Sequence, residues 1–497
     1  MSGLLRNPML MIALAITGGI AVWGIIDTAG LTALARRLII IQFTSRAWFI
    51  MLTVSFILIT SVALAFSRYG SIVIGADDDT PEFSTLSWLT MLFAAGMGVG
   101  LLYWGTAEPL THFIALDGAE GVDAVSASLF VTNFHWGFHA WAIYALSGLV
   151  IGYFGFRKGW PTLIGSPILA VFGQGPIPRG VAWLSDLLAI VAIAIGLGGS
   201  VAMGVFQIAD GVEILFGMEA QGITLMLAVF AVLVVAYLPP LTVDLSKGMA
   251  LLSNIAMAIA VVLMLYVLLA GPTHTIMGGL VQAGGEYLGS FFVQGFRTFT
   301  FMDEVTVGWF QDWTLTYMVW WLAWAPFVGV FIARISKGRT IREYLLGVIV
   351  APSAFSVMWF GIFGGAGFAA ALNDSLPVLD LVRDDTGAVT FYMLRQYPLS
   401  NVTIVLTLLA AFLFLVTSVV SAAFVLGMFS TRGDLNPSTR VKLGWGVILG
   451  ALGLVMILSG SIGAVKSIIA LGALPFVFVV LLLVVCFLKA LKDETPP

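Results

Sequence analysis

The sequence predicts an all-α polytopic membrane protein with twelve transmembrane helices. Of the 497 residues, 60% are hydrophobic and only 10% are charged, whereas an ordinary soluble domain carries about 25% charged residues. The mean hydropathy is +1.06, and apolar runs of the roughly 20 residues that one helical span needs recur from end to end. The predicted spans, in order, are 9–32, 47–68, 87–113, 125–154, 182–210, 222–240, 248–271, 312–335, 343–371, 401–429, 442–463 and 465–488.

Composition also argues against several classes of function. A single cysteine, Cys486, excludes an intrachain disulfide and makes a cysteine-ligated metal centre improbable. The net charge is only −4, and no basic run suggests a nucleic-acid partner. The connections between spans are short, so they leave no room for a soluble catalytic domain. We therefore predict no catalytic residues and no enzymatic activity.

The distribution of basic residues predicts the orientation in a bacterial inner membrane. Lysine and arginine concentrate in cytoplasmic loops, and the basic segment 334–342 follows the eighth span. Placing both termini in the cytoplasm puts this segment and most other basic residues inside. One cluster between the first two spans, Arg36, Arg37 and Arg46, then falls outside and argues against this orientation.

The third span contains three alternating glycines, Gly96, Gly98 and Gly100. Each glycine costs about 1 kcal/mol in a helix interior relative to alanine. One interpretation is close helix packing, for which Gly96 and Gly100 have the right spacing. We favour a broken helix, because three glycines exceed what packing needs. Broken helices near the bilayer midplane mark the substrate and ion sites of secondary transporters.

Tryptophan is concentrated in the fourth and eighth spans, although it usually lies at the headgroup level. Lipid-facing or packing roles are the alternative to a site. Several indoles within one span favour an aromatic cage, which binds quaternary ammonium groups through the ring faces without a formal counter-charge. The residues concerned are Trp136, Trp141, Trp313, Trp320, Trp321 and Trp324.

Three motifs in the same order resemble the betaine/carnitine/choline transporter family. They are GMGVGLLYWGTAEPL (96–110), FHWGFHAWAIYA (134–145) and WWLAWAPFVGVFIARISKGRTIREYL (320–345). The resemblance spans nearly the whole chain. It implies a homotrimer of the leucine-transporter-type fold, in which spans 3–7 and 8–12 form two inverted repeats of five helices. The implied organisation is two peripheral helices (1–72), the first repeat (73–272), an amphipathic surface helix and loop (273–311), the second repeat (312–490) and a short cytoplasmic tail (491–497).

The same resemblance implies roles for the aromatic residues. The cage corresponds to Trp136, Trp141, Tyr144 and Trp321, and the backbone of Gly96, Gly98 and Gly100 faces the substrate. Trp320 and Trp324 would line the permeation path, with Tyr103 and Phe327 as gate aromatics.

The glycine motif favours a zwitterionic substrate. Choline-carrying members of the family place an acidic residue at the position of Gly100, where this chain has glycine. A bare cation would find no carboxylate partner there, whereas freed backbone N–H groups could receive a substrate carboxylate. We therefore expect glycine betaine, carnitine or dimethylsulfoniopropionate. Glu108 is interpreted as a structural polar group near the helix end.

The resemblance also implies sodium as the coupling ion, with no other cofactor. Thr417 and Ser418 match the hydroxyl pair of the family's principal sodium site, and the carbonyls of Phe414, Ala94 and Met97 would complete it. Alone, such hydroxyls more often bond their own helix backbone. No lysine or arginine lies between Arg179 and Lys247 that could replace the ion. The positions of a second sodium site, Ile193 and Leu197, lack hydroxyls, which leaves that site open.

Other functions remain as alternatives. On the same fold, the chain could be a proton-coupled choline importer or a sodium-independent exchanger. A membrane-embedded enzyme could use His135 and His139, which are four residues apart, but no H-E-x-x-H frame or third ligand accompanies them. A channel is disfavoured because a bulky cage does not suit an open pore. We expect a transporter whose partners are a small zwitterion and membrane lipid.

Overall fold

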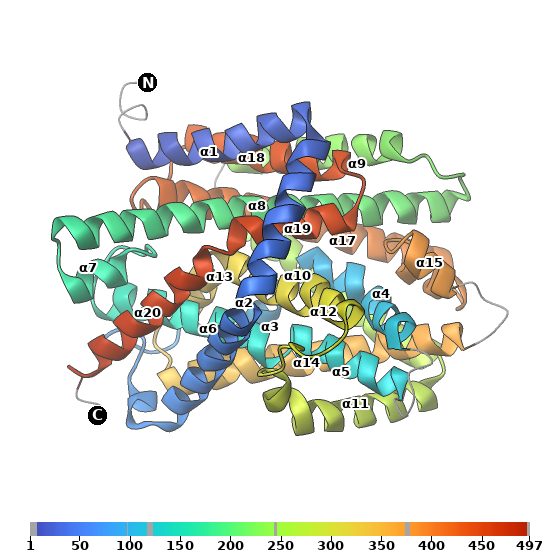
Figure 1. Ribbon diagram of the computed structural model, residues 1–497, viewed down its shortest axis with the longest axis horizontal. Helices are drawn as coiled ribbons and strands as arrows, with labels where there is room; N and C mark the ends of the chain where they lie inside the picture. The colour runs from blue at the N-terminus through green and yellow to red at the C-terminus, as the bar shows by residue number, and fades with distance from the viewer. Residues whose placement is uncertain (1–6, 97, 117–122, 243–245, 373–377, 495–497) are drawn as a thin grey trace.

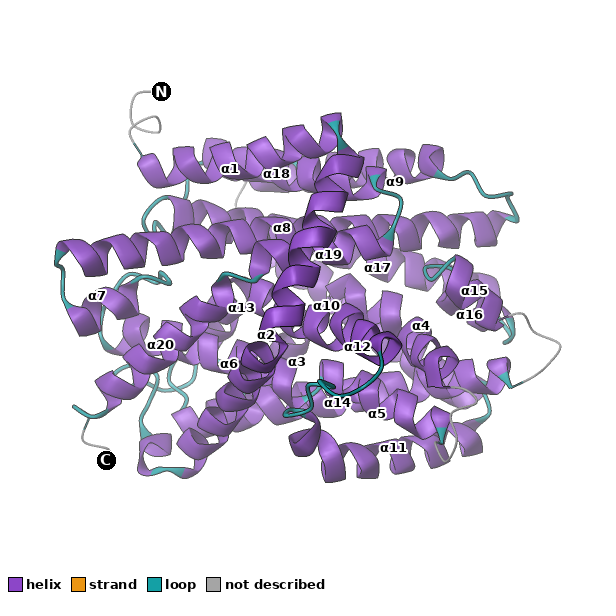
Figure 2. Ribbon diagram, in the orientation of Figure 1, coloured by secondary structure: helices purple, strands orange, loops and turns teal. Residues whose placement is uncertain are grey.

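Helices make up nearly all of the described chain in this computed structural model (Figures 1 and 2). The structure describes residues 7–96, 98–116, 123–242, 246–372 and 378–494, with only the backbone for 93–96, 246–248 and 250. Within these ranges, the one β-type contact is an isolated bridge between Val73 and Thr340. The all-α class is therefore confirmed.

The helices keep chain order with short connections. They are α1 (Pro8–Ile26), α2 (Thr28–Phe66), η2 (Arg68–Ser71), α3 (Thr85–Gly96), α4 (Gly98–Leu116), α5 (Ala124–Trp136), α6 (Phe138–Gly152), η3 (Tyr153–Arg157), α7 (Ser166–Phe172), α8 (Pro176–Phe216), α9 (Ile223–Tyr237), η4 (Pro239–Thr242), α10 (Ser246–Ala270), α11 (Thr273–Gln294), α12 (Glu304–Phe310), η5 (Gln311–Leu315), α13 (Thr316–Ile335), α14 (Ile341–Ala371), α15 (Val378–Asp384), α16 (Val389–Arg395), α17 (Ser400–Ser430), α18 (Thr439–Leu458), α19 (Ile462–Ala473) and α20 (Phe476–Leu491).

Ten helical stretches of the described residues are long and apolar enough to cross a membrane, or eleven if α19 and α20 form one span bent by 42°. The predicted third span is not among them. It is divided between α3, which is only 12 residues long, and α4, which carries Glu108 and His112. Met97 lies between them, outside the described residues. A polytopic membrane protein is thus confirmed, whereas the number twelve remains a prediction.

The second helix differs from the prediction. A loop was expected at 33–46, but α2 runs without interruption for 39 residues and carries Arg36, Arg37 and Arg46. The turn lies earlier, at Asp27, whose Oδ1 accepts the N–H of Gly30 at 2.8 Å and so caps α2. The predicted outside cluster of arginines is therefore part of a helix.

The longest helix, α8, runs through the middle of the molecule and packs against α17, α18 and α19 (Figure 1). A second group joins α13 to α6, and α4 to α5 and α14. The start of α1 and the end of α20 lie at the same end of the molecule, opposite α15 (Figure 1). These groups bring together the three motifs that are far apart in the sequence.

The C-terminal segment is held by ion pairs at this end. Glu494 accepts from Arg157 Nη2 at 2.9 Å and from the Tyr153 hydroxyl at 2.8 Å, and Lys158 Nζ lies 2.7 Å away. Burial alone would raise the pKa of Glu494, but hydrogen bonds from Arg157, Lys158 and Tyr153 outweigh it and hold the pKa at about 2. The carboxylate is therefore ionised throughout the physiological pH range.

We expect Glu494→Gln to lower the apparent melting temperature, because charge-assisted hydrogen bonds contribute on the order of 1.5–3 kcal/mol each before solvent screening. The folded-state pKa lies below the ordinary value of about 4.3. The stabilisation should therefore be constant from pH 8 to pH 5 and be lost only as the pH falls toward about 2. Thermal unfolding in detergent across this range, with the exposed Glu219→Gln as control, measures it. A difference that vanishes by pH 6 would contradict the assignment.

Candidate functional site

A cavity of about 570 Å³ lies where α4, α5, α6, α8, α13 and α17 meet. Aromatic rings form most of its wall, and the start of α4 forms one side of it. The lining residues are Gly98, Val99, Gly100, Trp104, Trp136, Tyr144, Ser200, Met203, Tyr317, Trp320, Trp321, Trp324, Leu415 and Ser418.

Three of the predicted cage rings stand edge to face around this cavity. The ring centroids of Trp136 and Trp321 are 5.2 Å apart at 86°, and those of Tyr144 and Trp321 are 5.2 Å apart at 75°. Aromatic pairs favour this geometry. All three rings are buried. Such a box presents ring faces, which attract an organic cation.

Hydrogen bonds fix both indoles of the box. Trp136 Nε1 donates to Glu108 Oε2 at 2.8 Å, and Trp321 Nε1 donates to the backbone carbonyl of His135 at 2.8 Å. Neither N–H group therefore needs a partner from the cavity. Both rings are held in one orientation before any ligand arrives.

The other predicted aromatics take different positions. Trp320 and Trp324 line the cavity, as the path residues were expected to. Trp141 does not line it and packs behind Tyr144 at 5.6 Å. Tyr103 lies against Trp104 at 4.8 Å, and Phe327 lies against Trp324 at 5.8 Å. Neither Tyr103 nor Phe327 is part of the cavity wall, so each stands one ring away from it.

The glycine motif places a helix start at the cavity. Gly98 and Gly100 belong to the first turn of α4 and line the cavity, whereas Gly96 is the last residue of α3. The first N–H groups of a helix have no partner within it and favour a negative charge. A Cβ on Gly100 would lie 3.3 Å from Trp136. A longer side chain at this position would therefore displace a cage ring.

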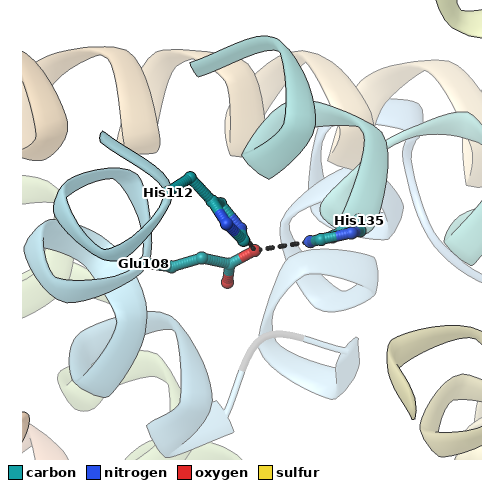
Figure 3. A group of neighbouring side chains, drawn as sticks. All are labelled: Glu108, His112 and His135. Carbon is teal, nitrogen blue, oxygen red and sulfur yellow. Dashed lines mark hydrogen bonds and ion pairs between the residues drawn. The ribbon is translucent and has the colours of Figure 1, made fainter. Parts of the chain in front are cut away.

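A buried carboxylate, Glu108, lies behind the cage (Figure 3). It is fully buried and accepts from Trp136, from the Tyr317 hydroxyl at 2.5 Å and from His135 Nδ1 at 2.8 Å. Three donors satisfy the carboxylate, which a buried charge requires. The expected structural role therefore extends to two residues that line the cavity. The i, i+4 spacing of Glu108 and His112 was the sequence signal for this cluster.

Glu108, His112 and His135 also lie close enough together to hold a metal ion. His112 Nε2 is 3.5 Å from Glu108 Oε1, and its Nδ1 accepts from Trp309 Nε1 at 3.2 Å. His135 Nε2 faces Thr314 Oγ1 at 2.9 Å. Since the ring nitrogens and carboxylate oxygens are engaged in hydrogen bonds, the donor set fits a proton-bonded network better than a metal centre.

His139 belongs to a different environment from His135. It lies on α6 with its ring 4.8 Å from that of Phe134 and 6.3 Å from that of Phe291. The pair that an embedded enzyme would use is therefore not assembled.

The predicted sodium ligands are described only in part. Thr417 is buried, and its hydroxyl donates to the carbonyl of Phe414 at 3.1 Å. Ser418 lines the cavity near Gly98. Met97 lies outside the described residues, and Ala94 is described only as part of the α3 backbone. Ile193 and Leu197 are buried in α8 and offer no hydroxyl.

Comparisons with known proteins agree with this site. The sequence pattern described as "BCCT, betaine/carnitine/choline family transporter" matches residues 8–496. A glycine betaine transporter of Bacillus subtilis is 39% identical over 98% of this chain and 95% of its own length. A probable glycine betaine transporter of Desulfitobacterium hafniense is 37% identical over 99% of this chain and 98% of its own length. An osmo-independent choline transporter of Acinetobacter baylyi is 36% identical over 90% of this chain and 86% of its own length.

These relatives are transporters, so the prediction that the chain is not an enzyme is confirmed. The match runs through the motifs around the cage and continues to both ends of the described residues. The chain belongs to the betaine/carnitine/choline transporter family.

Proposed function

We propose that this protein is a sodium-coupled symporter of a zwitterionic quaternary ammonium or sulfonium compound, such as glycine betaine, carnitine or dimethylsulfoniopropionate. The observation that carries the proposal is the box of Trp136, Tyr144 and Trp321 around a buried cavity. Each desolvated cation–π contact contributes about 2 kcal/mol. Three contacts give about 6 kcal/mol, and carboxylate contacts bring this into the range of micromolar binding.

The start of α4 supports a zwitterion over a bare cation. Gly98 and Gly100 bring unpaired backbone N–H groups to the cavity, where a substrate carboxylate could accept from them. No acidic side chain is present at Gly100 to balance a free cation. The relatives of the chain include proteins named for glycine betaine and for choline. A proton-coupled choline importer or a sodium-independent exchanger is therefore the alternative.

Sodium coupling is proposed from Thr417, Ser418 and the position of α17. The Thr417 hydroxyl and the Phe414 carbonyl are 3.1 Å apart, and Ser418 faces the start of α4. Hard oxygen ligands from a helix hydroxyl pair and from a neighbouring helix break are the type that sodium takes in transporters. The ion would then link α17 to α4, and so link the two halves of the chain.

For the transport cycle, we propose that two inverted repeats, spans 3–7 and 8–12, rock about the cage to give alternating access. The positions of α1 and α20 at one end of the molecule support termini on one side of the membrane (Figure 1), which the basic residues assign to the cytoplasm. The domain boundaries at 72, 272, 311 and 490 and the homotrimer are part of this proposal.

Trp321→Ala should raise the dissociation constant for glycine betaine by about 30-fold, because it removes one cation–π contact of about 2 kcal/mol. Equilibrium binding to purified protein, with and without sodium, measures the effect. Trp48→Ala, at an indole that is 60% exposed on α2, is the matched control. If Trp321→Ala binds betaine as tightly as the wild type and remains folded, the cage is not the substrate site.

Thr417→Val should weaken sodium activation of betaine binding by about tenfold or more, since it removes a hydroxyl ligand while keeping the side-chain volume. The matched control is Thr407→Val on the same helix, where the hydroxyl only bonds the carbonyl of Thr403. The sodium concentration for half-maximal betaine uptake in proteoliposomes is the readout. Equal sodium curves for both variants and the wild type would exclude this site.

Glu108→Gln should raise the dissociation constant for glycine betaine about tenfold. The amide nitrogen would face a donor, Trp136 or Tyr317, and an unpaired buried donor costs about 1–3 kcal/mol. The exposed Glu304→Gln on α12 is the control. Trp fluorescence titration and thermal unfolding separate the two effects of the change. Unchanged affinity would show that Glu108 does not orient the cage.

A further inference from the structure

A lysine, Lys466, is buried in an aromatic box of its own beside the cavity. It lies on α19 and is 8% exposed. Its Nζ is 3.3 Å from the ring centroid of Trp313, 5.1 Å from that of Trp104 and 5.9 Å from that of Tyr317. Nothing in the sequence pattern distinguished this lysine from an ordinary residue at the start of a span.

The ammonium group of Lys466 has no close counter-ion among the described residues, none of whose carboxylates lies within 4 Å of it. The carboxylates whose charge acts on it from further away are Glu108 and Asp312. Glu108 is already engaged by three donors, and Asp312 is exposed. Ring faces therefore provide the close contacts of the charge. A buried ionisable group inside a membrane protein is expensive and usually functional.

The lysine box shares two walls with the substrate cavity. Trp104 and Tyr317 contact the ammonium group on one side and line the cavity on the other. The ring centroid of Tyr317 is 5.7 Å from that of Trp136. Trp313, the third wall, lies in the π-helical turn Gln311–Leu315, a distortion that often marks functional sites. A fixed positive charge is thus one ring away from the cage.

We propose that Lys466 is a specificity-determining residue, whose fixed positive charge beside the cage disfavours bare onium cations and so selects zwitterions. The inference rests on the proposed function, because it assumes that the onium group enters the cage. A bare cation such as choline in the cage meets the repulsion of Lys466 without compensation. A zwitterion carries an equal negative charge on the same small molecule, so the repulsion and the attraction largely cancel.

The expected effect is measurable. Two unit charges on the order of 10 Å apart at an effective dielectric constant of about 20 change an equilibrium constant by about tenfold. Removing the lysine charge should therefore strengthen choline binding by about tenfold and change glycine betaine binding much less. Lys466 acts through the field and does not need to touch the substrate.

The test compares the dissociation constants of choline and glycine betaine in four proteins at fixed sodium. They are the wild type, Lys466→Gln, Lys466→Arg and Lys489→Gln. Lys489 is the matched control, because its Nζ also lies over a ring, 4.8 Å from the centroid of Phe172 on α7, away from the cavity lining. We expect the choline-to-betaine ratio to fall about tenfold in Lys466→Gln alone. If Lys466→Gln is not monodisperse, Lys466→Met keeps the side-chain length and tests the same charge.

The outcomes separate this inference from the function on which it rests. An unchanged ratio in a neutral variant that still binds betaine overturns the role of Lys466 and leaves the cage intact. Equal loss of both ligands in the glutamine and arginine variants also overturns it, because it shows a packing role. If the wild type binds neither ligand, the proposed function fails first.

Discussion

Both indoles of the cage have their N–H groups bonded away from the cavity, and this constraint determines what the site can bind. Trp136 donates to Glu108, and Trp321 donates to the carbonyl of His135. The cavity therefore meets ring faces there, rather than indole donors. Ring faces attract a positive charge that carries no hydrogen-bond donor of its own. The site suits a methylated onium group better than a hydrogen-bonding solute.

The same constraint explains why a carboxylate is buried behind an aromatic wall. Glu108 accepts from Trp136, Tyr317 and His135, which come from three separate helical elements. A single charged acceptor thus holds α4, α5 and α13 in register. The breaks on either side serve the other half of the ligand, because α4 starts at Gly98 beside the cage. Apolar rings for one end and backbone N–H groups for the other describe a zwitterion.

Much of this could be predicted from the sequence, for identifiable reasons. Apolar runs and a low fraction of charge predict a polytopic helical protein because the bilayer imposes length and hydropathy. Trp136, Tyr144 and Trp321 were identifiable because they lie in long motifs. The continuous α2 was missed because a cluster of arginines reads as a loop, although arginine is a good helix former. The roles of Tyr317 and Trp104 could not be predicted, since they depend on contacts between helices far apart in the sequence. The same is true of Lys466, whose partners come from α4, η5 and α13.

The most direct measurement is a cryo-electron microscopy map of the protein with sodium and glycine betaine. The account predicts density for the trimethylammonium group between the faces of Trp136, Tyr144 and Trp321, with the carboxylate directed at the first turn of α4. Betaine density at another place in the molecule, with this box empty, would contradict it.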